Sequence, residues 1–184
     1  MSSILNIPRV TSKYLVAAKA AVQFTRRVLD IGASNKMAPW DWWGKVTAAL
    51  CAGSVLNKGT LQERIDEEMA RTEKQKKADY GDYVDVMASW ARLFGCGNCG
   101  PHSAVAFVYL RDELKVLPLD WMMYNNFQHA FVIVGRRSDT EAEDFTTWNR
   151  DAAICDPWRG EAELVFPYAH LRFNQKHLEL LWST

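Results

Sequence analysis

The sequence has no run of about eighteen or more consecutive apolar residues, so it does not predict a membrane-spanning helix. Its first residues, MSSILNIPRVTSKYLVAAKAAV, lack the uninterrupted apolar core that a secretory signal peptide requires, and we expect no conventional secretion. Charge of one sign is not in excess, because 22 Lys and Arg residues balance 22 Asp and Glu residues. This balance gives no reason to expect a nucleic acid or an anionic membrane as partner.

Cysteine is also scarce. The chain has four, at positions 51, 96, 99 and 155, which are too few and too scattered for the disulfide framework of a small secreted domain. We therefore expect a reducing compartment or a reactive thiol. The 184 residues, 48% of them hydrophobic, suffice for the packed core of one domain over 1–184.

The first half of the chain predicts helices. We expect them over residues 13–31, 40–56, 82–94 and 102–114, with a charged, solvated segment over 60–80. Glycines at Gly32 and Gly95 are expected to end the first and third of these helices. The segment 102–114 is apolar on nearly all sides, which is typical of a helix buried at the centre of a domain.

The second half predicts strands. HAFVIVGR, AAICDPW and ELVFPYA are short β-branched or aromatic runs bounded by Gly, Asp and Pro. The polar segment 138–151 is expected to be an exposed connection, and 169–182, which contains His170 and His177, reads as a terminal helix or strand. The chain is therefore expected to be α+β, mainly helical over 1–95 and with a central helix and a small antiparallel sheet over 96–184.

The segment GCGNCGP has the features of a reactive cysteine at a helix start. Cys99 would stand at the N-terminus of the buried helix, where the helix dipole favours a thiolate and main-chain N–H groups face outward. Gly97 and Gly100 keep side chains away from the sulfur, and Pro101 suits the first helical turn because it needs no hydrogen-bond partner there. Cys99 is therefore the candidate nucleophile.

Two later residues could activate this thiol. His129 immediately precedes the strand AFVIVG, so a strand edge would hold it rigidly as a general base and acid. Asp156 ends the strand AAIC, where its carboxylate could accept the second imidazole N–H and orient the ring. The sequence therefore predicts a catalytic triad of Cys99, His129 and Asp156.

These segments resemble a known family. CGNCGPH before an apolar helix, HAFVIVG, and a strand ending in CDPW are similar to the papain-like superfamily of cysteine peptidases, with its bacterial effector and toxin branches. Papain carries its nucleophile on the second cysteine of a related CGSC segment, which favours Cys99 over Cys96. The resemblance covers roughly 93–158 and implies a papain-like fold with a cleft between the helices and the sheet.

The sequence departs from papain at the oxyanion site. Papain-type peptidases usually have a glutamine a few residues before the nucleophile, and Ala91 to Phe94 contain none. The main-chain N–H of Cys99 remains a donor, and Asn98 or Gln128 could supply the second. Trp158, close to Asp156, is expected to line the site or to fill the core.

The Asp at the third triad position is similar to the effector branches, whose members cleave peptide bonds or deamidate Gln or Asn of target-cell proteins. The resemblance implies a protein substrate in a target cell, a cognate immunity or inhibitor protein as a further partner, and no cofactor. It also implies delivery by a specialised bacterial secretion system into target-cell cytosol; otherwise the protein is expected to be cytoplasmic.

Three other interpretations stay open. Cys96, Cys99 and His102 match a zinc half-site whose fourth ligand would be Cys155, His129, His170 or His177. The same cysteine pair could be a thioredoxin-like redox motif, although a helix is expected before it where a thioredoxin has a strand. The chain could also be a non-catalytic protein-binding module on the same scaffold.

Overall fold

The protein is described by a computed structural model over residues 12–30, 80–125, 129–166 and 175–184. Within these ranges the helices are α1 (Lys13–Val28), α4 (Tyr80–Phe94) and α5 (Cys99–Val108), and a π-helical turn over Tyr109–Glu113 continues α5. The strands are β1 (Leu119–Tyr124), β2 (His129–Val134), β3 (Ala153–Asp156), β4 (Glu161–Leu164) and β5 (Leu178–Ser183), with a 3-10 helix over Gln175–His177 before β5. The fold class is α+β, as predicted.

The strands form one antiparallel sheet in the order β4-β3-β2-β1-β5. Tyr124 at the end of β1 pairs with His129 at the start of β2, and Val132 in the middle of β2 pairs with Cys155 on β3. Because neighbouring strands run in opposite directions, the start of β2 and the end of β3 lie at the same end of the sheet. This arrangement positions the candidate site.

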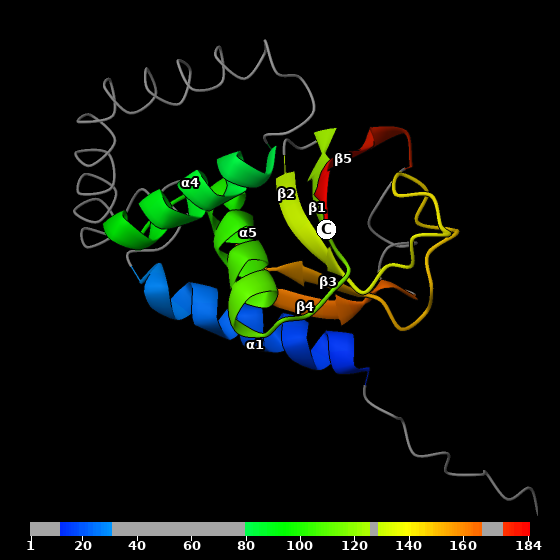
Figure 1. Cartoon of the computed structure of the whole chain (residues 1–184), viewed down its shortest axis with the longest axis horizontal. Coiled ribbons are helices and arrows are strands. Elements are labelled where there is room, and N and C mark those ends of the chain that lie inside the picture. Colours follow the sequence, from blue (N-terminus) through cyan, green and yellow to red (C-terminus); the bar gives the residue numbers. More distant parts are fainter. Residues whose placement is uncertain (1–11, 31–79, 126–128, 167–174) are drawn as a thin grey trace, which may run out of the picture.

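The three helices cover one face of the sheet (Figure 1). Helix α5 packs between α4, α1 and β2, and every side chain from His102 to Phe107 is buried. Trp121 on β1 is almost fully buried, and its indole Nε1 donates a hydrogen bond of 2.8 Å to Ser103 Oγ on α5. Each fully buried large apolar side chain stabilises the fold by about 1.5–3 kcal/mol, so α5 is held firmly in the helical layer.

Helix α1 lies close to the sheet because its buried face is made of small residues. Ala17, Ala18 and Ala21 are buried there, and Cys155 Sγ on β3 approaches the main-chain oxygen of Ala18 at 3.6 Å. Ser12 caps the helix, since its Oγ accepts a hydrogen bond from the Tyr14 N–H at 3.2 Å. Small side chains and a satisfied N-terminus together fix α1 over β3 and β4.

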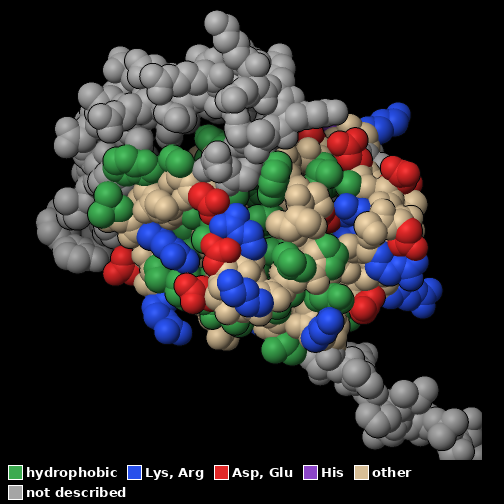
Figure 2. Space-filling model, viewed as in Figure 1, with side chains coloured by type: hydrophobic (Ala, Val, Ile, Leu, Met, Phe, Trp, Pro, Cys, Tyr) green, Lys and Arg blue, Asp and Glu red, His purple; other side chains and the backbone are tan. Residues whose placement is uncertain are grey.

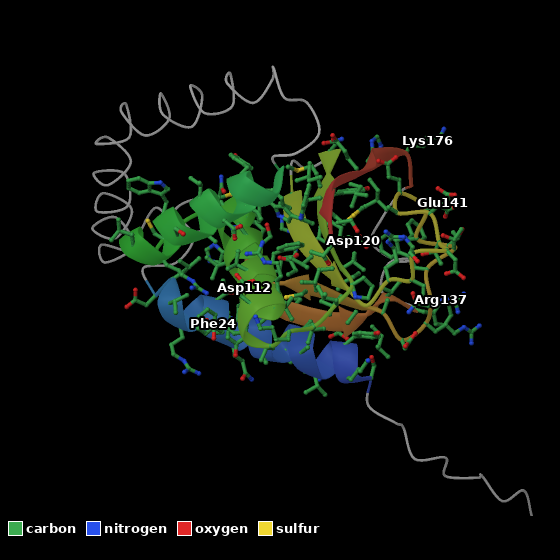
Figure 3. The ribbon with its side chains drawn as sticks, in the orientation of Figure 1. Phe24, Asp112, Asp120, Arg137, Glu141 and Lys176 are labelled. Atoms are coloured by element: carbon green, nitrogen blue, oxygen red, sulfur yellow. The ribbon has the colours of Figure 1, made fainter. Side chains whose placement is uncertain are left out.

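The opposite face of the sheet is covered by the connection between β2 and β3, over residues 135–152. Its aromatic residues Phe145 and Trp148 are buried against apolar side chains of β1, β2 and β3. Figure 3 places Arg137 and Glu141 of this connection on the side away from the helices. The connection was predicted to be exposed, which is wrong for Phe145 and Trp148, because the apolar second face of the sheet requires a cover.

The helix predictions hold where the structure describes the chain. Helix α1 ends at Val28, ahead of the expected stop at Gly32, and the Leu29 N–H bonds the Thr25 oxygen. Helix α4 ends at Phe94, and the predicted stop, Gly95, follows it directly in a left-handed conformation (φ 65°). The helix predicted over 40–56 lies outside the described residues, and so does the charged segment predicted over 60–80 except for Tyr80, which begins α4.

The strand predictions hold for β2 and β3 but need correction elsewhere. The run ELVFPYA was expected to be a strand, whereas β4 begins earlier, at Glu161, directly after a turn closed by Gly160 (φ 78°). Within the segment left open as a helix or strand, Leu178–Ser183 is a strand. No strand was predicted over β1, although β1 pairs with both β2 and β5.

Strand β1 was not predicted because its sequence contains a charged residue, Asp120, which is buried in the structure. Asp120 is 1% exposed, and its carboxylate accepts hydrogen bonds from Arg136 Nε and from Ser183 Oγ, each at 2.6 Å. Both partners are distant in sequence, and a buried charge is tolerated only when it is paired in this way. Asp120 is labelled in Figure 3, within the sheet.

Charged side chains of both signs are interspersed over the face seen in Figure 2. This mixture agrees with the balanced composition of the sequence. Among the described helices, none is both long and apolar enough to span a bilayer.

Candidate active site

Cys99 is the first residue of α5 and is partly exposed. Asn98 is the N-cap residue in an extended conformation (φ −91°, ψ −159°), so the chain turns sharply from the end of α4 into α5. A Cβ at Gly97 would lie 2.4 Å from the Cβ of Pro101, and only glycine fits there. The turn therefore places the thiol at the N-terminus of a helix, where a thiolate is stabilised.

His129 and Asp156 form a buried pair. His129 Nε2 lies 2.6 Å from Asp156 Oδ2, and the two residues are 5% and 3% exposed. The distance follows from the sheet, because His129 starts β2 and Asp156 ends the neighbouring antiparallel strand β3. Since a carboxylate only accepts, Nε2 carries the proton of this hydrogen bond.

The same histidine bonds the thiol. Because Nε2 is engaged by Asp156, the hydrogen bond between His129 and the Cys99 sulfur uses Nδ1. Burial raises the pKa of the Cys99 thiol. The hydrogen bond and charge of His129 lower it, and so do hydrogen bonds with the main chain at Ala130 and Gly100. The lowering contacts outweigh burial, so the pKa of Cys99 is lowered overall.

The pKa of His129 changes in the opposite direction. Burial lowers it, but the hydrogen bonds to Asp156 and Cys99 and their negative charges outweigh burial and raise the pKa of His129 to about 9. A lowered thiol pKa and a raised imidazole pKa favour the thiolate–imidazolium pair. The arrangement can therefore supply a nucleophile and a proton donor at once.

The turn after β3 holds Asp156. Its Oδ1 accepts a hydrogen bond of 3.1 Å from the Arg159 main-chain N–H, and Arg159 Nε forms an ion pair with Oδ2 at 3.5 Å. The Gly160 N–H closes the turn onto the Asp156 main-chain oxygen at 2.9 Å. Both carboxylate oxygens are thus occupied, so the carboxylate keeps its orientation toward His129.

Trp158 lies beside the imidazole. The ring centroids of Trp158 and His129 are 5.2 Å apart, with an interplanar angle of 53°, and Trp158 is partly exposed. An aromatic ring at this distance shields the His129–Asp156 pair from water on one side. Of the two expectations for Trp158, the structure places it at the site.

The other expected site residues have different outcomes. Asn98 adjoins Cys99, and its side chain makes no capping hydrogen bond to α5. Gln128 lies outside the described residues, as does His170. His102 lies one turn beyond Cys99, and its Nδ1 is 2.9 Å from the Asn98 main-chain oxygen. The sequence named His102 only as a possible zinc ligand, since a contact with a main-chain oxygen leaves no sequence signal.

The remaining cysteines differ from Cys99. Cys96 is disulfide-bonded, and its partner lies outside the described residues, because Cys99 and Cys155 are both free. Cys155 is free but fully buried, and burial together with the charge of Asp156 raises its pKa well above the usual range. Cys99 is therefore the only partly exposed free thiol in the described part of the chain.

The zinc site is not assembled by the described residues. They contain no group of three His, Cys, Asp or Glu side chains placed to hold a metal ion. The disulfide removes the Cys96 thiolate, and a thiolate is the form that binds zinc.

A groove of about 330 Å³ lies between α1 and β4 and contains no triad residue. Lys19 and Arg26 line it from the helix, and Glu161 and Glu163 line it from the strand. All are at the surface and of mixed charge, so this groove adds no chemistry to the site.

Comparison with known proteins gives no match: neither a protein-family model nor a curated protein sequence is similar to this chain. The support for a catalytic function is therefore the geometry of the residues themselves.

Proposed function

We propose that this chain is a papain-like cysteine hydrolase that acts on protein amides. Cys99 is the nucleophile, His129 the general base and acid, and Asp156 the residue that orients His129. The observation that carries the proposal is the continuous hydrogen-bonded series from the Cys99 sulfur through His129 to Asp156, with 2.6 Å between His129 Nε2 and Asp156 Oδ2.

The reaction follows from the positions of these groups. The Cys99 thiolate attacks the amide carbonyl carbon, and the tetrahedral intermediate collapses when the His129 Nδ1–H gives its proton to the leaving nitrogen. Ammonia or an amine departs and a thioester remains on Cys99. His129 then takes a proton from water, whose oxygen attacks the thioester, and the carboxylic acid and the thiol are released.

The substrate class rests on the family resemblance. The triad with Asp at its third position is similar to bacterial effector and toxin branches, and we propose a target-cell protein as substrate, with deamidation of Gln or Asn or cleavage of a peptide bond as the reaction. Delivery by a specialised secretion system and a cognate immunity protein belong to the same proposal. Both reactions use one acyl-enzyme, so the triad serves either.

The test is the pH dependence of iodoacetamide alkylation, mapped by peptide mass spectrometry, with His129→Ala as the comparison. The proposal expects Cys99 to react fast well below about pH 8.5, the reference for a free thiol, and to slow in the variant. Equal and slow reaction of Cys99 in both proteins would refute it and leave a non-catalytic binding module.

Intact-mass analysis of candidate protein substrates then separates the two reactions. Deamidation adds about one dalton per converted amide, whereas peptide-bond hydrolysis yields two fragments. Incubation with a Cys99→Ala variant is the control, and a mass change that persists in that control comes from another source.

A further inference from the structure

His102 makes a contact that an ordinary helix start does not have. Asn98, the N-cap residue of α5, has a main-chain oxygen that accepts the His102 main-chain N–H at 3.1 Å, as in any first helical turn. The same oxygen also lies 2.9 Å from Nδ1 of the His102 ring. One residue therefore donates twice to one carbonyl.

The chemistry of this contact fixes the proton on the ring. A carbonyl oxygen only accepts hydrogen bonds, so Nδ1 of His102 must carry a proton. His102 is 4% exposed, which keeps water from competing for the Asn98 oxygen. With both lone pairs of that oxygen occupied, the peptide unit between Asn98 and Cys99 is held more firmly than by the helical bond alone.

The held peptide unit contains the N–H of the nucleophile. In a planar trans peptide the C=O and the N–H point in opposite directions, so fixing the Asn98 carbonyl also fixes the direction of the Cys99 N–H. Hydrogen bonds to the carbonyl also polarise the unit and make its N–H a stronger donor. In acyl transfer this N–H is the one beside the thiolate, where the oxyanion of the tetrahedral intermediate forms.

We infer that His102 is a positioning residue for the oxyanion site: through two hydrogen bonds to the Asn98 carbonyl it aligns the Cys99 main-chain N–H with the developing oxyanion. The inference rests on the proposed function and assigns His102 no contact with substrate. This role explains why a histidine outside the triad is buried one helical turn from the nucleophile with its Nδ1 directed at the Asn98 oxygen.

Two reactions at the same sulfur separate this role from effects on the thiolate. Alkylation by iodoacetamide displaces iodide from a CH₂ carbon and forms no oxyanion. Acylation by p-nitrophenyl acetate passes through a tetrahedral oxyanion, releases p-nitrophenolate and leaves an acetyl thioester on Cys99. The ratio of the acylation rate constant to the alkylation rate constant therefore reports on the oxyanion site.

His102→Leu, which fills the site without a donor, is expected to lower this ratio about tenfold, less than the 10²–10³-fold loss typical of removing a whole oxyanion donor. His102→Asn, whose amide nitrogen occupies nearly the place of Nδ1, should restore it. His102→Gln places its amide farther out, so it should lower the ratio while keeping a polar side chain if the leucine variant does not fold.

Ser103→Ala is the matched control. Ser103 Oγ donates to the Gly100 oxygen at 2.9 Å, a side-chain bond of the same kind in the same turn, but one that does not involve the Asn98 carbonyl. Its removal should leave the ratio unchanged even if stability falls.

The outcomes are distinct. An unchanged ratio in both the leucine and glutamine variants, or an equal fall in Ser103→Ala, overturns the role of His102 while the triad stands. A wild-type protein that is neither selectively alkylated nor acylated at Cys99 overturns the proposed function together with this inference.

Discussion

The two free thiols of the described chain lie in opposite environments. Cys99 is partly exposed at the start of α5 and contacts His129, whereas Cys155 is fully buried on β3 beneath α1. The pKa of Cys99 is lowered and that of Cys155 is raised, although both thiols begin from the same reference value. The difference shows that the direction of the thiol pKa shift is set by the partner at the sulfur, because burial alone raises the pKa in both cases.

The largest effect, on iodoacetamide labelling, is expected when the two thiols are removed one at a time. Cys99→Ala should abolish iodoacetamide labelling of the described thiols near neutral pH, because the buried Cys155 is neutral and inaccessible. Cys155→Ala should leave labelling unchanged. Peptide mass spectrometry without reductant measures both, and labelling of Cys155 in the folded protein would contradict the comparison.

Removing the imidazole should make Cys99 behave as an ordinary cysteine. In His129→Gln we expect alkylation of Cys99 near neutral pH to slow by roughly thirtyfold, because an unperturbed cysteine is only a few per cent thiolate there. Rates measured across pH should show the titration of Cys99 moving upward. An unshifted profile would mean that the helix terminus, not His129, sets the thiol pKa.

Replacing the Asp156 carboxylate tests the contact between Asp156 and His129. Asp156→Asn should lower the pKa of His129 from about 9 toward its ordinary 6.5, measured by NMR titration of the imidazole, because its strongest raising contact is lost. The raised pKa stabilises the folded state fully below about 6.5, and this stabilisation is lost as pH rises through about 9.

Urea unfolding gives an independent check on the same variant. The difference in unfolding free energy between wild type and Asp156→Asn should shrink as pH rises through about 9. A difference that grows over this interval would contradict the assigned pairing.

The smallest effect concerns Cys155 itself. Cys155→Ala should lower the unfolding free energy by about 1 kcal/mol, since it removes a buried sulfur from beneath α1. The alkylation rate of Cys99 should stay at the wild-type value. A slower Cys99 would instead indicate that β3 has shifted and moved Asp156 with it.

The positions of Cys99, His129 and Asp156 could be predicted from the sequence because each of them stands at the boundary of an element. Glycines and Pro101 mark the helix start at Cys99, and the runs after His129 and before Asp156 are apolar enough to be strands. Two contacts at the site could not be predicted: the hydrogen bond from the Arg159 main-chain N–H to Asp156, and the contact between the His102 ring and the Asn98 main-chain oxygen. Both depend on the direction of main-chain groups, which the sequence does not show.

The fold is harder to predict where a charged residue, or a residue in a polar segment, is buried. Strand β1 contains Asp120, whose charge is compensated by Arg136 and whose carboxylate also accepts a hydrogen bond from Ser183. The connection between β2 and β3 is polar in sequence, yet Phe145 and Trp148 turn inward to cover the sheet. In both cases a long-range contact overrides the local pattern.

The connection over residues 135–152 has a consequence for engineering. His129 and Asp156 are 27 positions apart in sequence, and the chain between them passes round the back of the sheet while their strands stay hydrogen-bonded. A chain split within the exposed part of this connection would give two fragments, each holding an incomplete set of catalytic groups. Fragment complementation should therefore couple reassembly of the sheet to recovery of thiol reactivity.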